Sequence, residues 1–589
     1  MKPGETYAKL FDHSHKLATA YLKGFQTLLQ SQQVVYDNLR EIALVSRKIF
    51  DWQRSHQSSQ LLMQEEISLF KDYYQLYLHL FEKLLDKNIP PFIEPSAEDK
   101  RFKSPYWNDN FWFYSCQQSF LLFSKHMTEY IQNNPLENEK INEQVLFFSK
   151  QFLNALSPSN YLLTNPEVYL KTIEQGGANL FHGFEQMLTD LQQGQGYFIP
   201  LMVDINAFGV GKNLAMTPGK IVFKNKVIEL IQYSPSTEKV YEIPLLIVPP
   251  WINKYYILDL RPENSLVKWL VDKGHTVFMI SWVNPDESYK DVSFEDYMLM
   301  GLLPAIETIN KITQVNKINA LGFCIGGTLL AITIAYLHAK GVRHINSATF
   351  LATLLDFERP GDLGLMVDES QLSLLKHTIG IKGYLDGRLL MGIFNSLRAN
   401  ELFWPYFINN YLLGKPPYAF DLLYWNQDPS NLPAKMACEY LEDLYLDNRL
   451  VKESLSWDSV TLSLSKIDIP CYFLATERDH IAPWIASFNG AKRVKGDLTF
   501  VLGGSGHIAG IINPPKSSKY GYHIGHEDAK SFPTAASWLY AATRQEGSWW
   551  VHWQQWLSQL SGEFINARLL KQDLPNAPGE NVKKKINKS

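Results

Sequence analysis

Apolar positions along the chain change their spacing near Gly219. Before it, apolar residues recur three and four positions apart with few glycines or prolines, as in the run from Leu28 to Val45. This spacing is typical of amphipathic helices, so we expect a mainly helical N-terminal domain over residues 1–200. Two prolines at 90 and 91 end its first segment. These helices either pack within the protein or bind a partner or an apolar surface.

After Gly219, short apolar runs bounded by turns predict strands. The first two form a hairpin, the next two lie on either side of a helix, and a second helix leads to a further strand. In chain order these segments are Ile221–Phe223, Val227–Ile231, Ile243–Pro250, Pro262–Lys273, His275–Trp282, Phe294–Ile312 and Ile318–Phe323. Such alternation indicates a mostly parallel, doubly wound α/β sheet.

The stretch Leu321–Gly327, LGFCIGG, places a cysteine at the turn from that last strand to an apolar helix. Gly322 and Gly326 flank Cys324 in the pattern G-x-C-x-G, which is the nucleophile elbow with a thiol in place of a hydroxyl. The glycines permit a sharp turn. At the helix N-terminus, the N–H of Ile325 is expected to donate to an oxyanion. The alternative is an inert, buried cysteine.

Two later strands end in candidate catalytic side chains. The runs Ile469–Asp479 and Leu498–His507 are each a short apolar strand followed by an acid or a base. In open α/β sheets, functional groups gather beyond the carboxyl ends of the strands. Cys324, Asp479 and His507 therefore follow the order nucleophile, acid, base of an α/β-hydrolase.

Two neighbouring residues compete for these roles. His480 is a rival base, but as the neighbour of Asp479 it is expected to pack or to assist. Ser505 lacks the elbow pattern and has no helix following closely.

The second oxyanion donor is expected from the loop after the third strand, where Pro249 and Pro250 carry no N–H. Either Trp251 or Ile252 donates there, and the pattern does not choose between them.

A further strand is predicted at Ala348–Leu351. A region rich in aromatic residues and loops, about residues 355–464, separates it from the rest of the sheet. It is typical of a cap inserted above a catalytic site. We therefore predict an α/β-hydrolase domain over residues 201–575 that contains this cap. Residues 576–589 are expected to form a flexible tail.

Charge and cysteine content argue against several classes of protein. The net charge of −4 and the pI near 6.4 give no bias toward nucleic acid. Four widely spaced cysteines without a CxxC pair argue against disulfides or structural zinc and fit a reducing cytosol. The sequence has no run of 18 apolar residues, so it predicts no membrane-spanning helix. We expect a soluble cytoplasmic enzyme without metal or cofactor.

The thiol at the elbow favours one type of chemistry. Acyl exchange between two sulfur atoms changes the energy little, so a cysteine suits an enzyme that takes acyl groups from a thioester donor and passes them on. A serine would suit hydrolysis equally well. The sequence thus leans toward acyl transfer from CoA or a carrier.

Seven motifs occur in order along the chain: VPPWINKYYILDL (Val248 to Leu260), ISWVNPD (Ile280 to Asp286), LGFCIGG, TLLDF (Thr353 to Phe357), YWNQDPSNLP (Tyr424 to Pro433), ERDHIAPW (Glu477 to Trp484) and GGSGHIAGIINPP (Gly503 to Pro515). In these motifs the chain resembles the class I, single-subunit poly(3-hydroxyalkanoate) synthases. Similarity extends from DKRFKSPYW and SPSNYLLTNPE upstream to GSWW at Gly547 to Trp550.

The resemblance implies a polymerase that converts (R)-3-hydroxyacyl-CoA into polyester and releases CoA. Cys324 matches the acylated nucleophile, His507 its base, and Asp479 an acid that either orients the histidine or helps to activate the 3-hydroxyl. The region around Trp425 matches one implicated in substrate access and dimerisation.

The family further implies a homodimer at the surface of a cytoplasmic polyester granule, with granule-associated proteins as possible partners. TLLDF and NLPAKM (Asn431 to Met436) suggest short-chain monomers such as 3-hydroxybutyryl-CoA. A polymerase of medium-chain monomers, a cytosolic thioesterase or esterase of the same fold, and a non-catalytic granule-coat protein are the alternatives.

Overall fold

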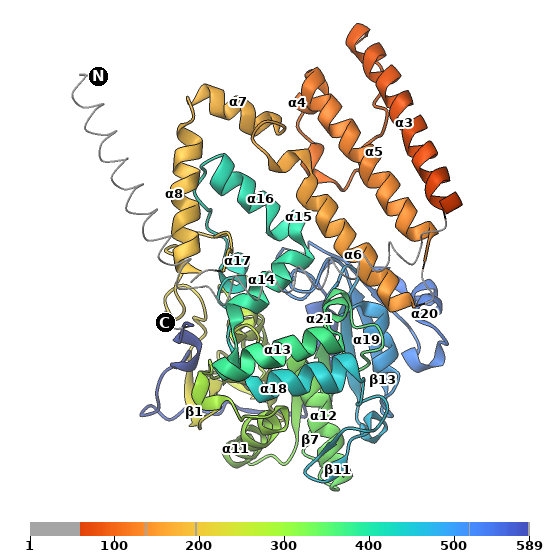
Figure 1. The fold of residues 1–589 in the computed structure, drawn as a ribbon. Coiled ribbons are helices and arrows are strands. Elements are labelled where there is room, and N and C mark those ends of the chain that lie inside the picture. The colour runs from red at the N-terminus through yellow and green to blue at the C-terminus, as the bar shows by residue number, and fades with distance from the viewer. Residues whose placement is uncertain (1–58, 87, 136–137, 195–196, 518, 587–589) are drawn as a thin grey trace, which may run out of the picture. The chain divides into compact units, whose positions relative to one another are not determined.

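The computed structural model describes residues 59–86, 88–135, 138–194, 197–517 and 519–586 (Figure 1). Within them the chain divides into two compact units. The first contains residues 59–202 and 392–418, and the second contains 203–391 and 419–586. The helical run predicted from Leu28 to Val45 lies outside the described residues.

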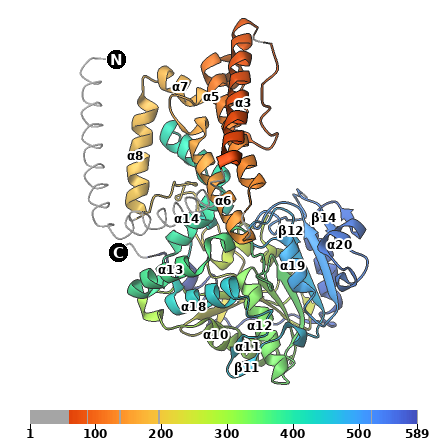
Figure 2. The ribbon, with the colours of Figure 1, turned by 45° about the vertical axis from the view of Figure 1, so that its right-hand side comes forward.

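The first unit is built of helices, which confirms the predicted helical character of the N-terminal region. Its helices are α3 (Ser59–Leu85), α4 (Tyr106–Asp109), α5 (Phe111–Asn133), α6 (Glu139–Leu156), α7 (Pro166–Glu174), α8 (Ala178–Gln193), α15 (Ala399–Leu402), α16 (Trp404–Tyr406) and the π-helix Phe407–Leu412. Figures 1 and 2 show α3, α5 and α6 side by side. No helix in the described part of the chain is long and apolar enough to cross a bilayer.

Asparagines set where three of these helices begin. The side chains of Asn110, Asn138 and Asn165 each accept a hydrogen bond from N–H groups of the first turn of α5, α6 and α7. Such a cap satisfies donors that have no partner within the helix. Pro166 supplies the favoured first residue of α7. These polar residues therefore mark the starts of α5, α6 and α7.

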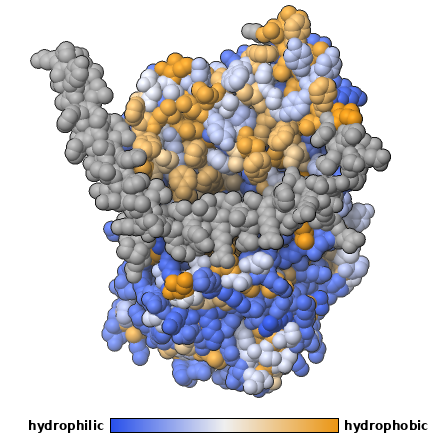
Figure 3. All heavy atoms as spheres, viewed as in Figure 1, coloured by the Kyte–Doolittle hydropathy of each residue, from blue (hydrophilic) through white to orange (hydrophobic). Residues whose placement is uncertain are grey.

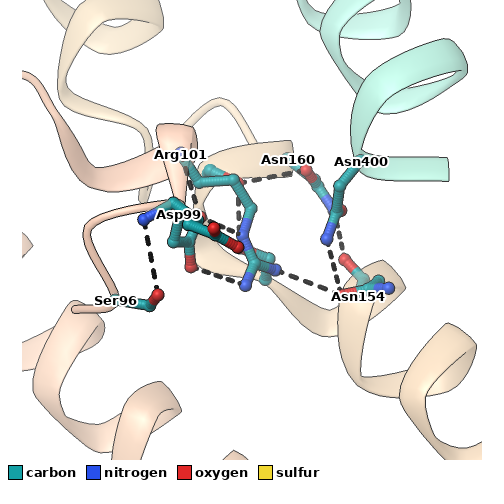
Figure 4. Close-up of polar contacts among 9 residues, drawn as sticks. Ser96, Asp99, Arg101, Asn154, Asn160 and Asn400 are labelled. Atoms are coloured by element: carbon teal, nitrogen blue, oxygen red, sulfur yellow. Dashed lines mark hydrogen bonds and ion pairs between the residues drawn. The ribbon is translucent and has the colours of Figure 1, made fainter. Parts of the chain in front are cut away.

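Residues 392–418 belong to this helical unit, although the sequence analysis assigned them to the cap. The Asn154 side chain accepts hydrogen bonds from Arg101 at 3.4 Å and from Asn400 at 2.8 Å (Figure 4). The hydroxyl of Tyr411 donates to Asp190 at 2.7 Å. The prediction of one continuous cap over residues 355–464 is therefore wrong in its middle, because these side chains find their polar partners on α6 and α8.

The second unit is organised around a ten-stranded mixed sheet, which confirms the predicted α/β-hydrolase fold. The strand order is β1-β2-β5-β4-β6-β7-β12-β13-β14-β15. Their bounds are β1 Gly219–Lys224, β2 Ile228–Tyr233, β4 Leu245–Val248, β5 Val277–Trp282, β6 Ile318–Phe323, β7 Ile345–Leu351, β12 Cys471–Thr476, β13 Leu498–Gly503, β14 Tyr522–Ile524 and β15 Thr543–Gln545. In this order, the central strands from β5 to β13 are parallel to one another. At one edge β1 pairs with β2 and β2 with β5, and at the other β13 pairs with β14 and β14 with β15, all in antiparallel fashion.

Helices and three two-stranded sheets complete the described part of this unit. They are β3 (Lys239–Tyr241) with β16 (Phe564–Asn566), α9 (Leu266–Asp272), α10 (Phe294–Asp296), the π-helix Tyr297–Leu302, α11 (Leu303–Thr313), α12 (Ile325–Ala339), α13 (Glu369–Lys382), β8 (Tyr384–Leu385) with β9 (Leu432–Pro433), α14 (Gly387–Leu397, which runs into the first unit), α17 (Asp421–Asn426), α18 (Ala434–Glu439), the π-helix Tyr440–Leu446, β10 (Ser456–Trp457) with β11 (Val460–Thr461), α19 (Trp484–Ala491), α20 (Ala535–Ala541) and α21 (Trp549–Gln559).

The helix that follows the elbow lies in the core. Every residue of α12 from Ile325 to His338 is buried, as are all residues of β6 before it. A helix that is apolar on all sides must be covered on all sides. The elbow between β6 and α12 therefore stands on rigid, buried elements.

The C-terminal segment is packed, not flexible. Residues 581–583 form a short 3-10 helix, and Val582 is only 2% exposed. The prediction of a flexible tail over residues 576–589 is wrong for 576–586. This segment is rich in lysine, but its backbone and its lysine side chains make hydrogen bonds and ion pairs within the second unit. The last three residues lie outside the described range.

Candidate active site

The elbow holds Cys324 in a conformation that few side chains adopt. Its φ is 54° and its ψ is −126°, between the end of β6 and the first residue of α12. Its N–H donates to the carbonyl oxygen of Leu351 on β7 at 2.9 Å. Strain of this kind persists where surrounding contacts enforce it, and it is common at functional sites.

The glycines of the motif allow three pieces of backbone to meet. A Cβ on Gly322 would lie 2.4 Å from the Cα of Gly327, and one on Gly327 would lie 2.0 Å from Oγ1 of Thr353. A Cβ on Gly326 would lie 2.3 Å from the carbonyl oxygen of Val248. Side chains at these positions would therefore separate β6, α12 and the loop after β4.

The structure brings the predicted acid and base together. The Nδ1 of His507 lies 2.7 Å from Oδ2 of Asp479, and both side chains are buried. The other carboxylate oxygen accepts the N–H groups of Ile481 and Ala482 at 2.9 and 2.8 Å. Asp479 is thus fixed by its own loop and holds the imidazole with Nδ1 turned toward the acid.

Cys324 is the other side chain that acts electrostatically on the imidazole of His507. The ring of Phe323 stacks on that imidazole at 5.6 Å. Burial lowers the pKa of His507, but the negative charges of Asp479 and Cys324 outweigh it and raise that pKa to about 10. The structure therefore pairs His507 directly with Asp479 and places Cys324 close enough to affect the pKa of His507.

His480 occupies a different place from His507. It is half-buried, and its carbonyl oxygen accepts the N–H of Asp362 at 2.9 Å. Its main chain thereby binds the start of the segment that follows β7. The partner of Asp479 is His507, as the sequence order indicated.

The loop after β4, residues 249–254, is called the β4 loop from here on. The carbonyl oxygen of Pro249 accepts the indole N–H of Trp282 at 3.0 Å, and the Trp251 ring packs among aromatic side chains of the core. Among the described residues, no hydrogen-bond acceptor meets the N–H of Trp251 or of Ile252. The N–H of Ile325 is the first of α12, where no acceptor within the helix exists. These are the groups available to an oxyanion.

Two tyrosines, Tyr440 and Tyr445, lie close enough to Cys324 for its charge to affect them, and the sequence motifs indicated neither. Tyr440 and Tyr445 are buried, and their rings meet edge to face at 5.4 Å. Burial raises the pKa of each phenol, and the charge of Cys324 raises both further. The hydroxyls therefore stay protonated. The sequence signal was only a cap rich in aromatic residues.

The comparisons with known proteins agree with this fold. An α/β-hydrolase fold model matches residues 244–514, and a model described as the poly-beta-hydroxybutyrate polymerase N-terminus matches residues 98–270. The fold and the elbow thus define the class as an α/β-hydrolase-fold enzyme.

Curated relatives identify the family within that class. A poly(3-hydroxyalkanoate) polymerase of Methylorubrum extorquens is 42% identical over 89% of this chain and 87% of its own length. The corresponding polymerase subunits of Rhizobium meliloti and Cupriavidus necator are each 40% identical, over 86% and 83% of this chain and 82% and 83% of their own lengths. The chain belongs to the poly(3-hydroxyalkanoate) polymerase family and is an acyltransferase-type enzyme.

Replacing Gly326 by alanine should disturb the site without unfolding α12. The new Cβ would lie 2.3 Å from the oxygen of Val248 and 2.7 Å from that of Pro249, and backbone atoms there cannot turn aside. We expect the rate of thiol release from acyl-CoA to fall roughly 100-fold. Gly380→Ala, in a helix with nothing within 4 Å of its Cβ, is the matched control. Equal rates in the two variants would contradict the expected crowding.

Proposed function

We propose that this protein polymerises (R)-3-hydroxyacyl-CoA into polyester with release of CoA, through a thioester on Cys324. One observation carries the proposal: His507 is hydrogen-bonded through Nδ1 to Asp479 at 2.7 Å and interacts electrostatically with the cysteine of the elbow. This arrangement supplies a nucleophile, its base and the group that orients the base. The names of the relatives support the substrate class.

The first step is acylation of the cysteine. His507 holds the proton of the Cys324 thiol, and the sulfur attacks the thioester carbonyl of the substrate. The N–H of Ile325, together with that of Trp251 or Ile252, stabilises the oxyanion of the tetrahedral intermediate. The carbon–sulfur bond to CoA then breaks, and the His507 imidazolium gives its proton to the departing thiolate.

The second step transfers the acyl group to oxygen. The 3-hydroxyl of a second acyl group attacks the Cys324 thioester while His507 accepts the hydroxyl proton. Collapse of this intermediate forms the ester and expels the cysteine thiolate, which restores the ion pair with the imidazolium. Asp479 keeps His507 in the tautomer that both steps need.

The monomer we propose is short, namely 3-hydroxybutyryl-CoA. The TLLDF stretch, Thr353 to Phe357, resembles that of short-chain enzymes and lies close to the elbow, since Thr353 limits the space at Gly327. A sulfur nucleophile suits this donor, because exchange between thioesters is nearly neutral in energy.

The growing product offers an apolar surface, and we propose that the enzyme works on it. Helix α3 exposes several large apolar side chains, among them Phe70, Tyr77 and Phe81, with exposed fractions of 75%, 65% and 57%. Figure 3 shows apolar residues gathered over the helices of the first unit. Large exposed apolar patches are typical of interaction sites. We therefore infer a location at the surface of polyester granules, with a homodimer as the working assembly.

The test is a thiol-release assay with (R)-3-hydroxybutyryl-CoA, followed by extraction and sizing of the product. We expect CoA release together with insoluble polymer, and enzyme that sediments with that polymer. Release of free 3-hydroxybutyrate would instead make the protein a thioesterase. No release from this substrate would overturn the short-chain proposal, and none from longer (R)-3-hydroxyacyl-CoA would overturn polymerisation itself.

A further inference from the structure

The C-terminal segment, residues 572–586, first runs beside the outer strand of the sheet. The N–H of Ile221 donates to the carbonyl oxygen of Pro575 at 2.8 Å, and the N–H of Ala577 donates to that of Gly219 at 2.9 Å. The Lys220 ammonium donates to the Leu574 carbonyl oxygen at 2.9 Å. The segment is thus fastened to β1.

A buried carboxylate then turns the segment toward the middle of the unit. The Glu229 side chain, which is 2% exposed, accepts the N–H groups of Glu580 and Asn581 at 2.9 Å each. Further on, the Asn284 amide donates to the carbonyl oxygen of Lys584 at 3.2 Å. These hydrogen bonds fix the position of the backbone from Glu580 to Lys584.

The path ends at a second buried carboxylate. The Lys585 ammonium lies 3.0 Å from Oδ1 of Asp428 and 4.9 Å from the centre of the Tyr424 ring. The same oxygen of Asp428 accepts a bond from Lys254 at 2.8 Å, and its other oxygen accepts one from the Tyr256 hydroxyl at 3.0 Å. Because Asp428 is 3% exposed, water cannot replace a lost partner at little cost.

Asp428 is joined to the β4 loop by more than Lys254. The N–H of Ser430 donates to the carbonyl oxygen of Ile252 at 2.9 Å, and the Trp425 indole donates to that of Lys254 at 2.6 Å. A β-bridge pairs Asn253 with Pro429. The C-terminal segment, the region around Asp428 and the β4 loop therefore form one continuous set of contacts.

We propose that the C-terminal segment is a strap that holds the β4 loop in its catalytic position, with Lys585 as a positioning residue acting through Asp428 and Lys254. This inference rests on the proposed function, in which that loop donates an N–H to the oxyanion. A donor displaced by an ångström or less loses much of its effect on the transition state. A residue remote from the substrate in the contact chain thereby affects the rate.

The chain offers a matched pair of lysines for the test. Lys583 pairs with Glu580 at 3.1 Å, and both side chains are substantially exposed, at 43% and 75%. Lys585→Gln and Lys583→Gln remove the same charge two residues apart, one inside the set of contacts and one outside it. Lys585→Arg keeps the charge and serves as the conservative variant.

Two measurements on the full-length protein decide the proposal. Amide hydrogen exchange in peptides covering residues 250–256 and 424–431 should be faster in Lys585→Gln than in Lys583→Gln. In the thiol-release assay kcat should fall roughly 10- to 100-fold with KM little changed, because an oxyanion donor acts chiefly in the transition state. Lys585→Arg should recover most of the loss.

Tyr256→Phe is the second variant if Lys585→Gln does not fold, since it removes one hydroxyl from the same carboxylate and keeps the ring. Faster exchange and a lower kcat are expected there too. Equal exchange in the two glutamine variants would overturn the strap, whatever the activity. Faster exchange with unchanged kcat would overturn the positioning role. A wild-type protein without CoA release would refute the proposed function, and hydrogen exchange would still decide whether the strap exists.

Discussion

Replacing Cys324 by alanine should abolish release of CoA from (R)-3-hydroxybutyryl-CoA, with a loss of roughly 10⁴-fold or more. In the proposed cycle the acyl group forms a bond to this sulfur when CoA leaves, and that bond breaks when the ester forms. The remaining groups of the site still bind the substrate, but no other described side chain at the elbow offers a nucleophile. The measurement is the initial rate of thiol release, with the product extracted and sized.

The variant should fold as the wild-type protein does. Alanine keeps the Cβ, so the elbow retains its shape at a φ of 54°, and α12 keeps its buried surroundings. A thermal melt should therefore show little change. Cys116→Ala, which removes another half-buried free thiol on α5, is the control and should leave the rate unchanged. Turnover close to wild type in Cys324→Ala would exclude the covalent mechanism.

Serine at the same position separates chemistry from geometry. Cys324→Ser preserves a hydrogen-bond donor toward His507 but forms an oxoester, which is a poorer acyl donor than a thioester. We expect acylation to be slow and transfer to the next hydroxyl to be slower still. A serine variant that polymerises as fast as the wild type would show that sulfur is not required.

The sequence was most informative where a local pattern determines local geometry. The glycines around Cys324 specify a sharp turn between a buried strand and a helix, and that turn is what the structure contains. Asp479 and His507 could be placed because each follows a short apolar strand of a parallel sheet, whose carboxyl ends share one edge. Their mutual contact follows from topology, over 28 residues of chain.

Contacts between distant segments with no periodic signal could not be predicted. Residues 392–418 read as part of a cap, because nothing in their sequence indicates that Asn400 will meet Asn154 or that Tyr411 will meet Asp190. The sequence alone puts Lys585 in the predicted flexible tail, because its partner Asp428 lies far away in sequence. Such pairs form because buried polar groups must find partners, and which partner they find depends on the whole fold.

Replacing Asp479 by asparagine should reduce turnover by roughly 10²- to 10⁴-fold while leaving the nucleophile in place. The carboxylate at 2.7 Å offsets the effect of burial on His507 and keeps the ring in one tautomer. An amide brings no charge and can present its NH₂ to Nδ1, which would turn the imidazole toward the wrong tautomer. Asp468→Asn, which alters a second His–Asp pair, with His338 at 3.0 Å, is the control and should not change the rate.

The same substitution should change how stability depends on pH. In the wild type the pKa of His507 is raised from its ordinary 6.5 to about 10. The raised pKa means that the folded protein holds this proton more tightly than the unfolded chain. The resulting stabilisation is complete below pH 6.5 and is lost as the pH rises toward 10. Without the carboxylate, burial dominates and the pKa of His507 falls, so this contribution should shrink strongly in Asp479→Asn.

Both effects can be measured on the same pair of proteins. An NMR titration of labelled histidine should place the His507 pKa of the variant well below that of the wild type. Chemical denaturation should be carried out on both proteins at pH 6 and pH 9. The free energy of unfolding of Asp479→Asn should fall below that of the wild type by more at pH 6 than at pH 9. A variant whose rate falls while the His507 pKa stays near 10 would mean that Asp479 acts on the substrate hydroxyl and not through the histidine. That outcome would decide between the two roles that the sequence left open for this acid.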